Sequence, residues 1–142
     1  MPTATDLAEV AARLVRFEGR SPSTTDAELA SAFIEVDQLG KAGIYVTSFS
    51  GRSEWERHQS GDELVQVLEG QAALTIMANP PVTVELRAGC LTVVPRGCWH
   101  RFDAPSGVSL VTVTPPPTDH HRDEAPPEAT SRARSGVATS SR

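Results

Sequence analysis

The chain has 142 residues, of which 39% are hydrophobic, and it carries a formal net charge of −5. This length and composition fit one domain with its own packed core. The acidic balance argues against a general nucleic-acid or anionic-membrane surface, because both need a basic face. No apolar stretch reaches the length of a membrane span, and the first ten residues lack the basic start of a secretory signal. We therefore expect a cytoplasmic protein.

The N-terminal 32 residues predict a short helical arm. Apolar residues recur at helical spacing from Leu7 to Phe17, Asp6 can cap this helix, and Gly19 is a suitable stop. A second helical turn is predicted to begin at Thr25, with an acid three residues later. We expect residues 1–32 to pack over the end or flank of the main domain.

Residues 33–114 predict an all-β domain. Short runs of β-branched and apolar residues alternate there with Gly, Pro, Asp and Ser. Many short strands at even spacing favour an antiparallel barrel or jelly roll, since closing the sheet hides its edges. The expected strands are Phe33–Val36, Gly43–Phe49, Trp55–His58, Glu63–Leu68, Ala72–Met77, Val82–Leu86, Leu91–Val94, His100–Ala104 and Val108–Thr114.

Residues 115–142 predict a disordered tail. The segment opens with three consecutive prolines and then offers almost nothing apolar to bury. Such a composition cannot offset the conformational entropy lost on folding. His120 and His121 lie in this tail, and we expect both to be solvated rather than to bind a metal.

A first cluster of ligand-type residues surrounds the strand predicted at 55–58. Alternate side chains of a strand share a face, so Glu56 and His58 point the same way, and Trp55 points the other way. The Ser-Gly-Asp turn at 60–62 then returns the chain, so that Glu63 can reach the same cavity. Converging imidazole and carboxylate groups are what a metal site in an apolar barrel requires.

A second cluster delivers another histidine. An apolar strand ends at the turn Pro95-Arg96-Gly97, and His100 opens the next strand, with Phe102 following on the same face. Cys98 shares that face, and a small buried thiol is the simplest interpretation of it. Tyr45, Phe49 and Phe102 either line the cavity or fill the barrel.

Together the two clusters resemble the paired motifs of the cupin superfamily. The second motif, G-x5-P-x-G-x2-H, is matched by Gly89, Pro95, Gly97 and His100. The later part of the first motif, H-x4-E-x6-G, is matched by His58, Glu63 and Gly70. The resemblance covers about residues 43–114 and is typical of small single-domain members. It implies a double-stranded β-helix barrel around one metal ion, with His58, Glu63 and His100 as the ligands carried over.

Two positions depart from the family pattern. The usual first histidine of the first motif is replaced by Glu56, and the asparagine that follows the last histidine falls at Ala104. Three interpretations of Glu56 stay open: a fourth, anionic ligand, a general-base or supporting carboxylate, or the mark of a cupin that has lost its metal. Without Glu56, the two histidines and Glu63 still form a set that suits Fe(II), with Mn, Zn and Ni as alternatives. Buried His and Glu can also pair with each other without any metal.

The sequence therefore predicts a metal-dependent enzyme that acts on a small organic molecule, of the oxygenase, isomerase or cyclase type, with Glu56 as a catalytic base or a fourth metal ligand. The alternative is a non-catalytic module that binds a small ligand, with or without metal. We expect no nucleic-acid or membrane partner. We expect a homodimer, because Trp55 and Trp99 lie on the outward face of the strands, where they can pack against the arm or a partner chain.

Overall fold

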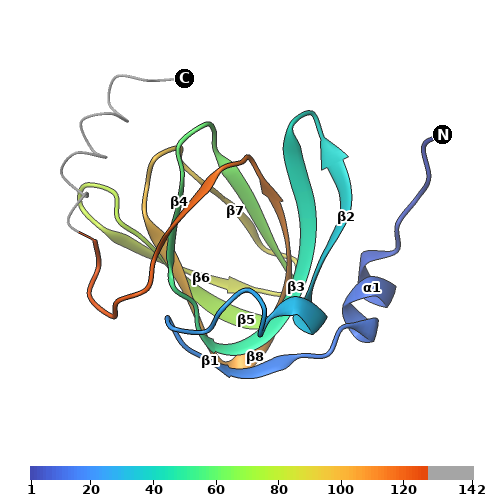
Figure 1. The fold of residues 1–142 in the computed structure, drawn as a ribbon, viewed down its shortest axis with the longest axis horizontal. Coiled ribbons are helices and arrows are strands. Elements are labelled where there is room, and N and C mark those ends of the chain that lie inside the picture. The colour runs from blue at the N-terminus through green and yellow to red at the C-terminus, as the bar shows by residue number, and fades with distance from the viewer. Residues whose placement is uncertain (128–142) are drawn as a thin grey trace.

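A computed structural model describes residues 1–127 of the chain. One sheet of nine strands curls into a half-barrel, with a short helix beside it (Figure 1). The elements, in chain order, are α1 (Leu7–Arg13), β1 (Phe17–Arg20), the 3-10 turn η1 (Ala30–Ala32), β2 (Phe33–Leu39), β3 (Ala42–Arg52), β4 (Trp55–His58), β5 (Glu63–Ile76), β6 (Val82–Arg87), β7 (Leu91–Val94), β8 (His100–Thr114) and β9 (Thr118–His121). This architecture confirms the predicted all-β fold with a short N-terminal helix.

The two longest strands, β5 and β8, hold the sheet together. They pair with each other antiparallel, while β5 also pairs with β6 and β7, and β8 also pairs with β3 and β4. The side chains that fill the curl are mostly aliphatic, with Phe49 and Phe102 packed edge to face among them. The apolar core therefore lies on the concave side, where the ligand-type residues also point.

Four of the predicted strands are halves of two long ones. The predicted strands stop on either side of Glu69-Gly70 and of residues 105–107, as they would at turns, but both β5 and β8 run on through these positions with shifts in register. Gly70 and Gly107 face each other there, both at positive φ, and a Cβ on Gly70 would overlap the carbonyl oxygen of Gly107. The glycines thus mark a close crossing of two bent strands rather than two chain reversals.

The N-terminal segment is less helical than predicted. Asp6 caps α1 by accepting a hydrogen bond from the Glu9 amide, but the helix ends at Arg13, before the expected stop at Gly19. Residues 17–20 instead form β1, which pairs parallel with β3. Phe17 packs against the core, so burying this side chain favours a strand over another helical turn.

The second predicted turn is confirmed. The Thr25 amide donates to Glu28 Oε1 at 2.9 Å, and the Glu28 amide donates to Thr25 Oγ1 at 3.2 Å. This reciprocal pair is a capping box, and η1 follows it. The segment between β1 and β2 is therefore held in a defined shape.

The segment after Thr114 corrects the prediction of a disordered tail. Residues 118–121 form β9, which pairs antiparallel with β4. Trp55 and Trp99 do face outward, as predicted, but this segment covers them: Trp55 Nε1 donates to the Glu124 carbonyl at 3.4 Å, and His121 packs edge-on against Trp99. Burial of two indoles gives the strand its packing partner. The rest of the predicted tail, residues 128–142, lies outside the described part of the chain.

In the described part of the chain, no helix has the length and apolar character needed to cross a bilayer.

Candidate metal centre

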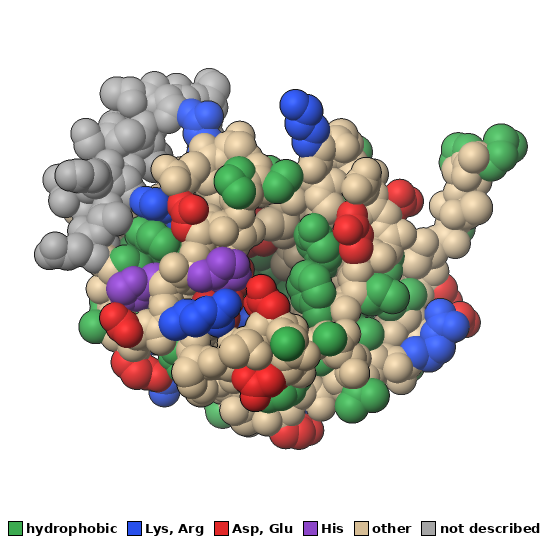
Figure 2. Space-filling view, viewed as in Figure 1, with side chains coloured by type: hydrophobic (Ala, Val, Ile, Leu, Met, Phe, Trp, Pro, Cys, Tyr) green, Lys and Arg blue, Asp and Glu red, His purple; other side chains and the backbone are tan. Residues whose placement is uncertain are grey.

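A cavity of about 300 Å³ opens on the concave side of the sheet. The face in Figure 2 is hollowed near its centre, with hydrophobic side chains on one side and histidine, acidic and basic side chains on the other. Its apolar lining consists of Leu29, Phe33, Tyr45, Phe49, Phe102 and Leu110. Of the two alternatives for Tyr45, Phe49 and Phe102, the structure has all three lining the cavity, with Phe49 and Phe102 also part of the core. Cys98 is a buried core thiol and does not line the cavity.

Three strands bring the four sequence-predicted site residues together. Glu56 and His58 share one face of β4, Glu63 is the first residue of β5, and His100 is the first residue of β8. Glu56 and His100 are directly opposite each other where β4 pairs with β8. All four side chains therefore meet at one end of the half-barrel.

The histidines and Glu63 form a tight, buried group. Glu63 Oε1 lies 3.0 Å from His100 Nε2, and Glu63 Oε2 lies 3.3 Å from His58 Nε2. Both Nε2 atoms and Glu63 Oε1 are nevertheless buried without a hydrogen bond of acceptable geometry. Buried polar atoms in native proteins almost always have partners, so three such atoms close together are suited to binding a cation.

Outer contacts hold the imidazoles with their Nε2 atoms turned inward. His100 Nδ1 lies 3.0 Å from the Cys98 carbonyl, which can only accept, so this nitrogen carries the proton and Nε2 is left free for a ligand. His58 Nδ1 lies 3.1 Å from the Thr118 hydroxyl. Glu63 Oε2 accepts a hydrogen bond from Thr114 Oγ1 at 2.6 Å. Such contacts orient metal ligands and fix their tautomers.

The group is also strongly coupled electrostatically. Burial alone would raise the pKa of Glu63, but the adjacent His100 and His58 side chains outweigh it and hold this pKa well below its usual range. Burial would lower the pKa of His100, but the neighbouring Glu63 carboxylate outweighs it and raises this pKa. The pocket thus stabilises an anionic carboxylate beside positive charge, which a bound cation would also supply.

Glu56 lies within reach of the same point. Glu56, His58 and His100 each offer a ligand atom, and these atoms all lie within 4.8 Å of one another. The Glu56 side chain is 25% exposed and lines the cavity. Burial, together with the neighbouring Glu54 carboxylate, raises the pKa of Glu56 to about 8. Its position keeps both the ligand and the general-base interpretations open.

A second polar cluster, Arg20–Glu54–His120, adjoins Glu56 and was missed by the sequence reasoning. Arg20 Nη2 lies 2.9 Å from Glu54 Oε1, and His120 Nδ1 lies 3.0 Å from Glu54 Oε2. Burial alone would raise the pKa of Glu54, but the bond from His120 and the charge of Arg20 outweigh it and hold this pKa far below its usual range. His120 also lies 3.8 Å from Glu56 Oε2. His120 is therefore part of the cavity wall rather than a solvated tail residue.

The donor set fits a first-row divalent ion. Two imidazoles with one or two carboxylates suit Fe, Mn, Zn or Ni, and the cavity beside them leaves room for a further ligand. The described residues thus contain a candidate His/Glu metal-binding group, Glu56, His58 and His100, and a neighbouring group, Glu54, Glu56 and His120, whose ligand atoms lie equally close together. Which of these residues bind an ion is a prediction.

Comparisons with known proteins agree with this fold. The model of the family described as Cupin domain matches residues 48–114. A protein of known structure from Neisseria meningitidis is 18% identical, with a TM-score of 0.61 over 80% of this chain and 100% of its own. A cupin-2 domain protein from Shewanella frigidimarina is 18% identical, with a TM-score of 0.53 over 67% of this chain and 96% of its own.

Some of the similar structures are enzymes. The hydroquinone 1,2-dioxygenase of Sphingomonas sp. TTNP3, solved with 4-hydroxybenzoate bound, is 18% identical, with a TM-score of 0.56 over 78% of this chain and 72% of its own. At this identity the likeness concerns the fold alone. No curated protein matches the sequence.

Proposed function

Because this chain carries a cupin domain, we propose that it holds one divalent metal ion through His58, Glu63 and His100 and acts as a metal-dependent enzyme on a small organic molecule. The reaction would be of the oxygenase, isomerase or cyclase type. The similarity of fold to a hydroquinone 1,2-dioxygenase is compatible with this class.

One observation carries the proposal. The Nε2 atoms of His58 and His100 and the Oε1 atom of Glu63 are buried, face one another and lack hydrogen bonds of good geometry. A merely structural His–Glu cluster would be expected to close these bonds, since an unsatisfied buried group costs about 1–3 kcal/mol. A divalent ion would satisfy all three atoms together.

The surrounding residues would prepare a small molecule for reaction. When bound, the ion would supply Lewis-acid or redox chemistry at its open positions. The apolar wall around Phe49, Phe102 and Leu110 excludes water and contacts the body of the ligand. Glu56, which lines the cavity beside the histidines, would in its ionised form accept a proton from the ligand, provided that it does not itself bind the ion.

Elemental analysis tests the metal. The purified protein, stripped and reloaded in turn with Fe, Mn, Zn or Ni, should hold about one ion per chain for at least one metal, and His100→Ala should hold none. Glu56→Ala should keep the ion if Glu56 is a base and lose it if Glu56 is a ligand. His121→Ala is the matched control, because His121 bonds the Ala125 carbonyl outside the cavity. A wild-type protein that takes up none of the four metals would refute the site.

Turnover is tested separately. The metal-loaded protein would be incubated with a panel of small aromatic and oxo acids, with oxygen consumption and product formation followed. We expect turnover of at least one substrate, with loss of activity in His100→Ala. Tight ligand binding without turnover by the loaded protein would support the non-catalytic module instead.

A further inference from the structure

We infer that Arg20 anchors a negatively charged group of the substrate, so that the cavity takes a small organic anion with its charged end at β1 and the rest reaching toward the histidines. This inference rests on the proposed function, since it names the substrate class of the same cavity.

The fold places Arg20 in the cavity through a close approach of β1 to β3. Arg20 is opposite Gly51 in that pairing. Gly51 has a φ of +99°, and a Cβ at this position would lie 2.6 Å from the Arg20 amide nitrogen and overlap the Arg20 carbonyl oxygen. Only glycine allows the two backbones to approach in this way. The N-terminal segment is therefore part of the cavity wall, and not merely a packing arm.

The Arg20 guanidinium is fixed but only partly used. Its side chain is 9% exposed, its Nη2 pairs with Glu54, and its plane lies over the Phe49 ring with 4.7 Å between Cζ and the ring centroid. Its Nε is buried without a hydrogen-bond partner. A guanidinium has five N–H donors, and in Arg20 only Nη2 pairs with Glu54, so donors remain for a ligand. Held in one orientation, such a group is suited to binding a carboxylate.

The charge of Glu54 does not cancel this role. Both carboxylate oxygens of Glu54 are covered, Oε1 by Arg20 and Oε2 by His120. Glu54 is 1% exposed and does not line the cavity, whereas Arg20 and His120 do. The cavity therefore meets the donors and not the carboxylate behind them. Asp26 also lines this wall, but it is 76% exposed and pairs with Arg122, so water screens its charge.

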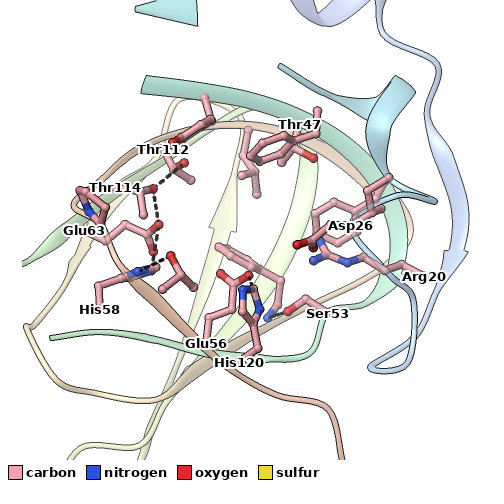
Figure 3. Close-up of a pocket in the computed structure, with 18 residues that line it drawn as sticks. Arg20, Asp26, Thr47, Ser53, Glu56, His58, Glu63, Thr112, Thr114 and His120 are labelled. Carbon is pink, nitrogen blue, oxygen red and sulfur yellow. Dashed lines mark hydrogen bonds and ion pairs between the residues drawn. The ribbon is translucent and has the colours of Figure 1, made fainter. Parts of the chain in front are cut away.

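The position of Arg20 sets the pose of the ligand. Figure 3 shows Arg20 on the opposite side of the cavity from His58 and Glu63, with Glu56 and His120 between them. A volume of about 300 Å³ is at the small end of ligand pockets. A compact anion can thus be held at Arg20 while its body contacts the aromatic wall and its other end faces the metal ligands.

Calorimetric titration with benzoate and with its neutral analogue benzamide tests the inference. Both ligands would be titrated into the metal-loaded protein and into the protein treated with EDTA. We expect wild type to bind benzoate about 10-fold or more tighter than benzamide in both forms, because bonds to a charged group are the stronger ones. Arg20→Gln combined with Glu54→Gln should abolish that preference, and this double variant leaves no unpaired buried charge. The single variant Arg20→Lys keeps the positive charge and should retain part of the preference for benzoate.

Arg57→Gln is the matched control. Arg57 also pairs with a carboxylate, Asp119 at 3.0 Å, and also stacks on an aromatic ring, that of Trp99, but it does not line the cavity. This variant should keep the full preference for benzoate. A wild type without preference, or a double variant that keeps it, would overturn the role of Arg20.

The metal is measured in the same samples, so the two proposals can fail separately. A protein that holds one ion per chain but shows no Arg20-dependent preference overturns this inference alone. A protein that takes up no metal but keeps the preference after EDTA treatment overturns the metal site and supports the anion anchor.

Discussion

Replacing Gly51 by alanine should weaken the attachment of β1 and with it the cavity wall. Gly51 has a φ of +99°, which L-residues rarely adopt, and this conformation alone costs about 1–3 kcal/mol. The added Cβ also meets the backbone of Arg20, which no side-chain rotation can relieve. Separating β1 from β3 would then lose further backbone hydrogen bonds, at about 1 kcal/mol each. We expect a total loss of about 3–5 kcal/mol in the free energy of unfolding.

Gly89→Ala is the control that isolates the contact. Gly89 has a similar φ of +90°, but a Cβ there has nothing within 4 Å. It should therefore cost only the conformational part, about 1–3 kcal/mol. Thermal unfolding by circular dichroism should show Tm falling by about 9–15 °C for Gly51→Ala and by about 3–9 °C for Gly89→Ala, at about 3 °C per kcal/mol. Equal losses of Tm in the two variants would refute the reasoning that β1 is held by close contact at Gly51.

Three further results are expected at the metal centre. Thr118→Val should weaken Zn²⁺ binding about 10-fold in a chelator-competition assay, because His58 Nδ1 loses its hydroxyl partner. Thr118→Ser keeps the hydroxyl and should bind Zn²⁺ as wild type does. Equal affinities in all three proteins would contradict a role of Thr118 in orienting His58. The affinity for Zn²⁺ should rise about 10-fold or more from pH 6 to pH 8, since the raised pKa of His100 means that a proton competes with the ion at low pH. An affinity that does not change with pH would contradict the assignment of His100 as a ligand. Finally, Zn²⁺ at about 100 times its Kd should stabilise the protein by about 2.7 kcal/mol, seen as an increase in Tm that His100→Ala does not show; the same increase in that variant would place the binding elsewhere.

The four residues proposed at the site could be found from sequence because their placement is local. Strand alternation puts Glu56 and His58 on one face, a three-residue turn returns Glu63, and a Pro-x-Gly turn precedes His100. Their convergence in the structure follows from these short-range rules together with the antiparallel pairing of β4, β5 and β8. The short strands β4 and β7 were also predicted with their observed bounds.

The residues that sequence reasoning missed reach the cavity through long-range contacts. Arg20 comes from a strand that pairs parallel with β3, and Thr118 and His120 come from a strand whose composition reads as a tail. The segment of β9 and the residues after it covers both indoles, Trp99 through His121 and Trp55 through Glu124. This stabilisation cannot be predicted from residues 115–121 themselves. The predicted turns at 69–70 and 105–107 failed for a similar reason. A glycine pair that allows two strands to cross closely has the same local signature as a chain reversal.

The candidate metal ligands and the other residues of the cavity wall come from different parts of the chain. All four candidate ligands lie within residues 48–114, the stretch that matches the family, while Arg20, Thr118 and His120 lie outside it. The residues that bind the ion would then belong to the stretch that matches the family, and the choice of ligand would depend on the segments before and after it, which line the cavity. Exchanging those flanks between relatives could redirect the protein to a new compound without altering a single ligand of the ion.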